Sequence, residues 1–252
     1  MINILCTMGG RSQFFDVAEY PFPKPLIEIN GKSMIEFAVE NYKTLSPGSR
    51  FVFVLRSEDC VKYHIDSVVK LLTDNKCKIV KIDKETAGAA CSALMAIEHI
   101  NNNDKLLIVN SDQVIEEDMS AIVEHFDKRG ADAGVVCFES VHPRWSFVRL
   151  NEENKIIEAA EKRPISKHAV AGVYYFRKGS FFVEAAMRSV TKGAHVNGVY
   201  YVAPVLNELV LMHKNMEMYK VPNDKYYTFY SPQKIAEYEN VVSNRAAGKR
   251  AE

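Results

Sequence analysis

Short apolar runs alternate with amphipathic segments along the first 140 residues of the chain. The apolar runs cover residues 2–8, 50–56, 76–83, 105–111 and 132–139, and they are continuous enough for strands buried on both faces. Helix-type spacing separates them, at residues 33–45, 59–73, 89–100 and 117–128. The first of these helices begins with Ser33 and has Glu36 three residues later, which is the spacing of a capping box. The pattern predicts a Rossmann-like α/β fold in which a mixed, mostly parallel sheet is flanked by helices.

The pattern changes after about residue 143. The runs at 145–150 and 156–161 flank the polar turn at 151–155 and predict a hairpin, and residues 169–176 read as another strand. Helices are expected at 179–190, 200–213 and 232–243, with a late strand at 217–222. No Pro/Gly/Ser linker and no internal repeat divides the chain. We therefore expect one domain over residues 1–252 with a small β-rich inserted region.

Charge and composition exclude several classes of protein. The 32 lysines and arginines balance the 32 aspartates and glutamates, so a basic surface made for nucleic acid is not expected. The amino terminus has no basic region, and no apolar run approaches the roughly 20 residues of a membrane span, so we expect a cytoplasmic protein. The five cysteines form no CxxC pair and the seven histidines no HExxH motif, which favours reduced, buried thiols over zinc or disulfides.

A pair of glycines directly follows the first strand, in the segment CTMGGRSQFF. Gly9 and Gly10 allow a sharp turn whose backbone N–H groups form an anion site, and phosphate fits such a site. Arg11 and Lys24 add positive charge, and the prolines on either side of Lys24 stiffen its backbone. The motif matches neither GxGxxG nor GxxxxGK[ST], so an ordinary surface loop with solvated cations is an alternative.

The fourth strand ends in polar residues, in the segment LLIVNSDQVI. Ser111 and Asp112 are placed at the carboxyl edge of the sheet, where open α/β folds bind ligands. A carboxylate there can hold Mg²⁺ against triphosphate oxygens, because Mg²⁺ commonly uses one or two carboxylates together with the phosphates. The alternative is that Asp112 caps the next turn or helix.

Six segments occur in a specific order over most of the chain: MGGRS, PKPLIEINGKSMIEFAVEN, TAGAACSAL, NSDQVI, WSFVRLNEENKIIEAAEKRPIS and AVAGVYYF. This series resembles the sugar-phosphate nucleotidyltransferases, in the branch found in capsule and surface-polysaccharide gene clusters. The resemblance implies a GT-A-like fold with a nucleotide-binding half at 1–140 and an acceptor-binding half at 141–252. It further implies the following roles: a phosphate loop of Met8, Gly9, Gly10, Arg11 and Ser12; a base-contacting turn with Gly88 and Ala89; Lys24, Arg11 and Lys162 at the transferring phosphoryl group; Ser111 and Asp112 at the nucleotide and Mg²⁺; and Glu161, Lys162 and Gly172 at the acceptor.

Three positions depart from the family pattern. Gln13 stands where the family usually has a triphosphate-clamping arginine, and Val199 stands where it has a glutamate that commonly holds sugar hydroxyls. The family's late aspartate, which often completes the metal site, is Thr228 here, and Asp224 is a candidate substitute. Tyr200 and Tyr201 are candidates for the acceptor pocket, whereas Trp145 and the other tyrosines of the second half are expected mainly to pack.

The resemblance implies attack by a phosphomonoester on the α-phosphorus of a nucleoside triphosphate, with CTP as the preferred donor and pyrophosphate released. The partners are then the triphosphate and a small phosphorylated acceptor, sugar or not, and a homodimer is left open. Two alternatives remain. One is a nucleotide-sugar glycosyltransferase, against which the absence of a DxD motif argues. The other is a nucleotide-binding regulatory paralogue without turnover, suggested by Gln13, Val199 and Thr228.

Overall fold

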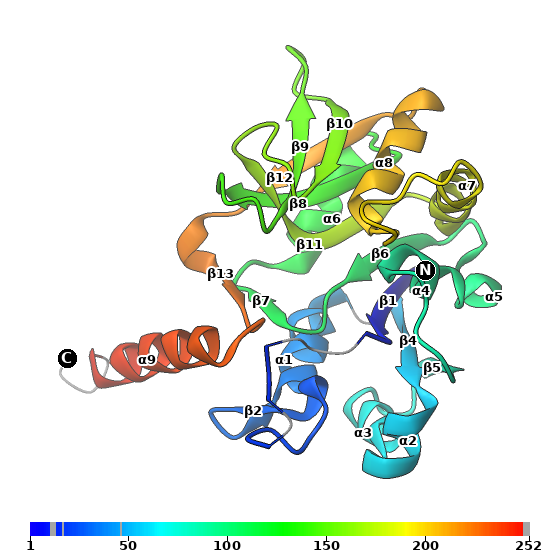
Figure 1. The fold of residues 1–252 in the computed structure, drawn as a ribbon. Coiled ribbons are helices and arrows are strands. Elements are labelled where there is room, and N and C mark those ends of the chain that lie inside the picture. The colour runs from blue at the N-terminus through cyan, green and yellow to red at the C-terminus, as the bar shows by residue number, and fades with distance from the viewer. Residues whose placement is uncertain (11–13, 17, 46, 249–252) are drawn as a thin grey trace.

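The computed structural model describes residues 1–10, 14–16, 18–45 and 47–248. Figure 1 shows a central sheet with helices packed around it, and this confirms the expected α/β fold class. The strands of the main sheet are β1 (Ile2–Met8), β4 (Ser49–Arg56), β5 (Cys77–Ile82), β6 (Lys105–Val109), β8 (Ala133–Glu139), β9 (Ser146–Leu150), β10 (Ile156–Glu161), β11 (His168–Phe176) and β12 (Met216–Lys220).

The main sheet is mixed. Its strands run in the order β10-β9-β11-β6-β1-β4-β5, and β8 joins β11 and β12. The neighbouring pairs β6–β1, β1–β4 and β4–β5 are parallel. In contrast, β11 is antiparallel to β6, β8 and β9. The predicted hairpin forms as β9 and β10, and it attaches through β9 to the same sheet.

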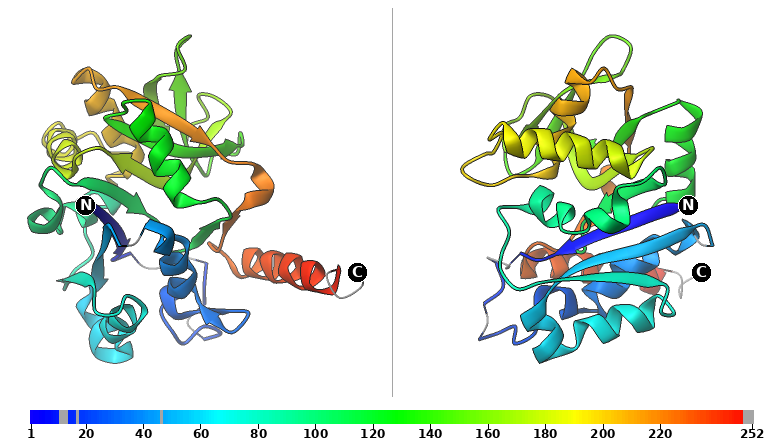
Figure 2. Two further views of the ribbon diagram at one scale, coloured as in Figure 1. Left: turned by 180° about the vertical axis from the view of Figure 1, so that it is seen from behind. Right: turned by 90° about the vertical axis from the view of Figure 1, so that its right-hand side faces the viewer.

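Helices cover both faces of this sheet. Side chains alternate along the strands, so that Phe51 and Phe53 of β4 enter one buried cluster while Val52 and Val54 enter the other. The right-hand view of Figure 2 shows α7 and α3 on opposite sides of β1. The helices are α1 (Met34–Asn41), α2 (Ser57–Tyr63), α3 (Ile65–Leu72), α4 (Ala89–Leu94), α5 (Ile97–Ile100), α6 (Met119–Lys128), α7 (Gly179–Thr191), α8 (Val202–Leu211) and α9 (Pro232–Gly248).

Several helix boundaries differ from the expected ones. The helix expected at 59–73 is two helices, because His64 adopts a left-handed conformation with φ of 52° between α2 and α3. The segment at 89–100 is likewise divided into α4 and α5. The capping box at the start of α1 is confirmed, since Glu36 Oε2 accepts hydrogen bonds from the Ser33 amide at 2.6 Å and from the Ser33 hydroxyl at 2.8 Å. The last helix, α9, continues to Gly248 rather than ending near residue 243.

Among the described residues, two small sheets and three short helical turns accompany the main sheet and its helices. One small sheet pairs β2 (Glu28–Ile29) with β3 (Lys32–Ser33), and the other pairs β7 (Gln113–Ile115) with β13 (Tyr226–Thr228). The turns are η1 (Lys24–Leu26), η2 (Lys43–Leu45) and η3 (Asn223–Lys225). Figure 1 shows α9 projecting from one side of the molecule. Phe229, Ile235 and Tyr238 anchor this end of the chain against Phe15 and Met34 in a third buried cluster.

The five cysteines are free thiols, and Cys6, Cys60 and Cys137 are buried as expected, while Cys77 and Cys91 are half-buried. No helix within the described part of the chain is long and apolar enough to cross a membrane.

Candidate active site

The glycine turn and the polar end of β6 leave the sheet at the same edge. β1 and β6 are parallel neighbours with Cys6 opposite Val109, so Gly9 and Gly10 emerge beside the segment from Asn110 to Asp112. In open α/β sheets this carboxyl edge is where ligands bind. Gly9 itself is packed tightly, because a Cβ there would lie 2.5 Å from Cδ1 of Ile82, whereas a Cβ on Gly10 would meet nothing within 4 Å.

A cavity of about 470 Å³ opens at this edge, and we call it the glycine-loop cavity. Its lining includes five of the expected nucleotide-site residues, which come from three separate segments: Met8, Gly10, Lys24, Ser111 and Asp112. Arg11 and Ser12, which were expected beside them, lie outside the described residues.

Lys24 and Asp112 are in direct contact in this cavity. The Lys24 ammonium forms an ion pair with Oδ2 of Asp112, and each side chain is 22% exposed. The lysine opens the turn η1 after Pro23, and its Nζ lies 5.8 Å from the centre of the Phe15 ring. The fold therefore places one cation and one carboxylate together at the mouth of the strand-end site, within reach of solvent.

The expected base-contacting turn is held against the second half of the chain. Gly88 has φ of +133°, and a Cβ on it would lie 2.4 Å from the carbonyl oxygen of Tyr200. Tyr200 pairs with this turn through its backbone: its N–H donates to Ala87 at 2.8 Å, and its carbonyl accepts from Ala90 at 3.0 Å. Ala89 begins α4 directly after the glycine. A glycine is needed at position 88 both for its backbone conformation and for this close approach.

The expected acceptor residues Glu161 and Lys162 lie at the end of β10. Ser146 donates a hydrogen bond to Oε2 of Glu161. Burial raises the pKa of Glu161 above its ordinary value of 4.5, although the Ser146 hydrogen bond acts in the opposite direction. Lys162 has φ of +54°, and its Nζ donates to the Tyr201 hydroxyl at 2.8 Å. That hydrogen bond raises the pKa of Lys162, so this lysine is held as a cation by its tyrosine partner.

Gly172 links β11 to the end of β6. It has φ of +65°, and a Cβ on it would lie 2.1 Å from Nδ2 of Asn110 and 2.8 Å from Oε1 of Gln113. The Asn110 N–H also donates to the Gly172 carbonyl at 3.2 Å. The contact brings the acceptor-half strand directly against the residues that flank Asp112.

Asp224 is not brought together with Asp112. In the small sheet Thr228 lies opposite Gln113, and the Phe229 N–H donates to the Asp112 carbonyl at 2.7 Å. Asp224 belongs to η3, beyond the opposite end of β13, and it is exposed. The sequence-based expectation of a second metal carboxylate at Asp224 therefore does not fit the geometry, because β13 separates the two aspartates.

The residues around Asp112 fit Mg²⁺ if the phosphates of the nucleotide supply the other ligands. Over the described ranges no group of three or more His, Cys, Asp or Glu side chains could hold a metal ion. Asp112 supplies a single carboxylate at the rim of the glycine-loop cavity. Since Mg²⁺ is commonly held by one or two carboxylates and by the phosphates of the nucleotide, one carboxylate is enough for this mode of binding.

Sequence reasoning missed part of the glycine-loop cavity. Arg56, Glu58, Asp59 and Lys62 line it from the end of β4 and from α2. The signal that could have found them is the parallel register of β1 and β4, with Met8 opposite Leu55, because it brings the end of β4 to the same edge.

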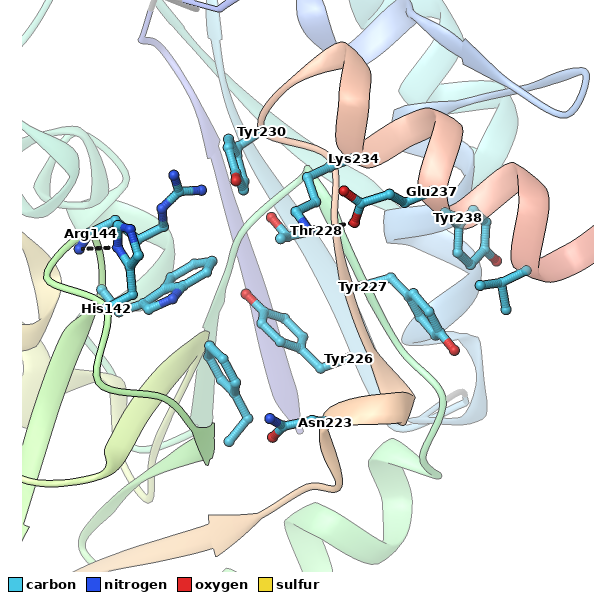
Figure 3. Close-up of a pocket in the computed structure, with 13 residues that line it drawn as sticks. His142, Arg144, Asn223, Tyr226, Tyr227, Thr228, Tyr230, Lys234, Glu237 and Tyr238 are labelled. Carbon is cyan, nitrogen blue, oxygen red and sulfur yellow. Dashed lines mark hydrogen bonds and ion pairs between the residues drawn. The ribbon is translucent and has the colours of Figure 1, made fainter.

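A second cavity, of about 500 Å³, lies next to β13 and is shown in Figure 3. We call it the aromatic cavity, because six of its lining residues are aromatic: Phe138, Trp145, Tyr226, Tyr227, Tyr230 and Tyr238. Tyr226 and Tyr227 extend to opposite sides of the β13 ribbon in Figure 3. Trp145, which was expected mainly to pack, lies edge-on to Tyr226 and Tyr230 and also borders this open space.

The sequence profile of the family described as nucleotidyl transferase matches residues 18–208. The curated relatives that are similar to the chain include two bifunctional proteins. They are the bifunctional protein GlmU of Thermodesulfovibrio yellowstonii, 25% identical over 211 residues, and that of Methanocaldococcus jannaschii, 28% identical over 182 residues. The matches cover 80% and 71% of this chain but only 44% and 40% of those proteins, so the chain spans less than half the length of these relatives.

Solved structures share the fold. A nucleoside-diphosphate-sugar pyrophosphorylase from Vibrio cholerae RC9 superimposes with a TM-score of 0.81 at 22% identity, covering 95% of this chain and 100% of that one. A UDP-glucose pyrophosphorylase complexed with UDP-glucose superimposes with a TM-score of 0.74 at 19% identity, covering 97% and 100%. At these identities the likeness supports the fold alone.

Proposed function

The chain belongs to the nucleotidyl transferase family, and on that premise we propose that it transfers a nucleoside monophosphate from a nucleoside triphosphate to a small phosphorylated acceptor, releasing pyrophosphate. One observation carries this proposal. The glycine turn, Lys24 and Asp112 come from three separate segments and line one cavity at the carboxyl edge of the sheet. A triphosphate fits such a combination of backbone N–H groups, a cation and a metal-binding carboxylate.

In the proposed reaction an oxygen of the acceptor phosphate attacks the α-phosphorus of the triphosphate. The new bond joins that oxygen to the α-phosphorus, and the bond from the α-phosphorus to the oxygen bridging it to the β-phosphorus breaks, so that pyrophosphate leaves. The second pKa of a phosphate monoester is about 6, so the attacking oxygen carries no proton near neutral pH. The chain therefore needs no general base, and its task is to align two anions and reduce their repulsion.

The described residues divide this task between the two halves of the chain. The backbone at Gly9 and Gly10 and the Lys24 ammonium bind the triphosphate, and Lys162 binds the acceptor phosphate. Asp112 would hold Mg²⁺, which when bound supplies positive charge at the phosphates. Lys24 contacts Asp112 in the structure, so nucleotide binding requires the ammonium to exchange the carboxylate for a phosphate oxygen. Arg11 is proposed as a further cation of this site on the family resemblance alone.

We propose CTP as the donor, on the resemblance to the shorter cytidylyltransferases, and synthesis of a capsule or surface-polysaccharide precursor as the role. The test is a screen of the four ribonucleoside triphosphates against phosphorylated sugars, polyols, choline and amino-acid derivatives, read by pyrophosphate release. We expect at least one pair that includes CTP to release pyrophosphate in the presence of Mg²⁺. Absence of release from every pair would count against the proposal.

A matched pair of variants tests the site itself. Asp112→Asn removes the carboxylate charge and should abolish Mg²⁺-dependent release without unfolding the protein. Asp224→Asn makes the same change at the far end of β13, outside the glycine-loop cavity, and should leave the rate unchanged. Equal rates for Asp112→Asn and the unmodified chain would remove Asp112 from the site.

The alternative of a nucleotide-binding regulatory protein without turnover is supported by the residue that lies beside the Asp112 segment. The residue of β13 opposite Gln113 is Thr228, which carries no charge, so the segment beside Asp112 adds no second carboxylate. A nucleotide-binding regulatory protein without turnover would need no second metal ligand. It is distinguished by nucleotide binding, measured by calorimetry, that persists while pyrophosphate is never released.

A further inference from the structure

Segments that line the aromatic cavity contact the segments that carry the proposed reaction. Tyr230 packs edge-on against Phe14, just after the glycine turn, with ring centres 5.8 Å apart. The Phe229 N–H donates to the Asp112 carbonyl at 2.7 Å, and the Trp145 carbonyl accepts from the Lys162 N–H at 3.0 Å. The segments that form the walls of the cavity therefore contact the Phe14 ring and the backbones of Asp112 and Lys162.

Tyr226 stands between the aromatic cavity and the segment that carries Asp112. The Tyr226 hydroxyl lies 3.4 Å from Oε1 of Gln113, the residue after Asp112. Desolvation raises the pKa of Tyr226, and the negative charge of Asp112 acts in the same direction, which reflects how near the two groups are. The cavity and the Asp112 segment are therefore neighbours, and the Tyr226 side chain is the group between them.

The charges of the cavity do not cancel. Lys234 and Glu237 form an ion pair with each other, as Figure 3 shows. Arg144 lies over the face of Tyr230, with its guanidinium carbon 4.2 Å from the ring centre. Within the described part of the chain no carboxylate pairs with the Arg144 guanidinium. One positive charge therefore remains uncompensated at the end of the cavity where Arg144 and Tyr230 meet.

We propose that the aromatic cavity holds the end of the acceptor away from its phosphate, and that this end carries a carboxylate bound by Arg144. The proposal rests on the proposed function, because it assigns the second substrate of the same site. The volume of about 500 Å³ is within the usual range for a small-molecule site, roughly 300–1,000 Å³. A guanidinium stacked on an aromatic ring still presents its N–H edge, which matches a carboxylate with two parallel hydrogen bonds.

Other ends fit the cavity less well. A quaternary ammonium suits aromatic rings in general, but here the Tyr230 face is already covered by a cation that would repel it. An uncharged polyol offers no negative charge to Arg144, so it would leave that guanidinium without a counter-charge in the cavity.

Trp145 makes a direct binding assay possible, because it is the single tryptophan of the chain and lines the cavity. The probes are glucuronic acid 1-phosphate and glucose 1-phosphate, which differ only in a carboxylate against a hydroxymethyl group, and phosphocholine, which carries a cation. They are titrated against Trp145 fluorescence with Mg²⁺ and a CTP analogue that has a methylene group between the α- and β-phosphorus, so that no turnover occurs.

We expect glucuronic acid 1-phosphate to bind about tenfold more tightly than glucose 1-phosphate, as one charge-assisted contact allows, and phosphocholine to bind most weakly. Arg144→Gln should reduce the tenfold preference to less than about twofold, by loss of that contact. Arg163→Gln, a change outside the cavity at an arginine paired with Glu158, should preserve the preference.

The outcomes separate this proposal from the proposed function. Equal affinities, a preference for phosphocholine, or no response of Trp145 to any probe would overturn the assignment of the cavity, even in a chain that releases pyrophosphate. The expected order of affinities in a chain that never releases pyrophosphate would support the cavity and count against the transferase.

Discussion

Gly88→Ala tests how the two halves of the chain are joined at the expected base-contacting turn. A Cβ at position 88 would lie 2.4 Å from the oxygen, 2.7 Å from the nitrogen and 2.9 Å from the carbon of the Tyr200 peptide. These are backbone atoms, so no side-chain rotation relieves the clash. The segment at Tyr200 must move, and its hydrogen bonds to Ala87 and Ala90 are weakened or lost.

The cost can be assembled from three contributions. A strained backbone with φ of +133° costs about 1–3 kcal/mol in a residue other than glycine. Two weakened backbone hydrogen bonds cost about 0.5–1.5 kcal/mol each. The reduced freedom of the unfolded chain returns about 0.4–1 kcal/mol. The free energy of unfolding should therefore fall by about 3 kcal/mol, a large part of the 5–15 kcal/mol that is typical of native proteins.

Urea unfolding followed by circular dichroism measures this loss, and Gly193→Ala is the matched control. Gly193 also has positive φ, of +65°, but a Cβ there would meet nothing within 4 Å. The free energy of unfolding of Gly193→Ala should fall by only about 1 kcal/mol, because this variant has backbone strain but no steric clash. Equal losses in the two variants would refute the contact between Gly88 and Tyr200 as the cause.

Three further predictions concern polar side chains of the candidate site. Lys24→Gln should lower kcat/KM in the pyrophosphate assay by about 10²- to 10³-fold, by analogy with loss of one transition-state donor. Its melting temperature should hardly change, because a partly exposed ion pair contributes at most about 1 kcal/mol; a large drop would show a structural role instead. The raised pKa of Glu161 means that the folded state holds this proton more tightly than the unfolded state, so the unmodified chain should lose stability relative to Glu161→Gln as pH rises above about 4.5. A stability difference that stays constant in thermal melts from about pH 4 to 8 would contradict this. Tyr201→Phe keeps the ring but removes the hydroxyl that accepts from Lys162, and it should raise the KM for the acceptor severalfold while the affinity for nucleotide, measured by calorimetry, stays the same.

Long apolar runs made much of the fold predictable. Residues 2–8 and the hairpin from 145 to 161 form strands as expected, because each buries enough apolar surface to impose its own periodicity. The β7–β13 sheet was not predictable. Its strands have three residues each and pair across more than 100 positions, so no local pattern marks them. The break between α2 and α3 at His64 was not predictable either, because a single left-handed residue leaves the apolar spacing on either side unchanged.

The candidate site, like the fold, was predictable from the sequence only in part. Lys24 and Asp112 were predictable as neighbours because both follow from strand ends and turns that the sequence marks clearly. Asp224 was a candidate metal ligand because it is close in sequence to Thr228, but Thr228 ends β13 beside Gln113 while Asp224 lies before the other end of that strand. The aromatic cavity depends on Trp145, Tyr226 and Tyr230 meeting from distant segments, which only the tertiary structure decides.

A crystal structure of the chain with Mn²⁺ and the methylene analogue of CTP tests the central claim most directly. The account predicts the triphosphate in the glycine-loop cavity, with its oxygens within hydrogen-bond distance of the Gly10 backbone and the Lys24 ammonium, and an anomalous Mn²⁺ peak on the Asp112 carboxylate. A nucleotide bound away from that cavity, or a metal bound without Asp112, would contradict it.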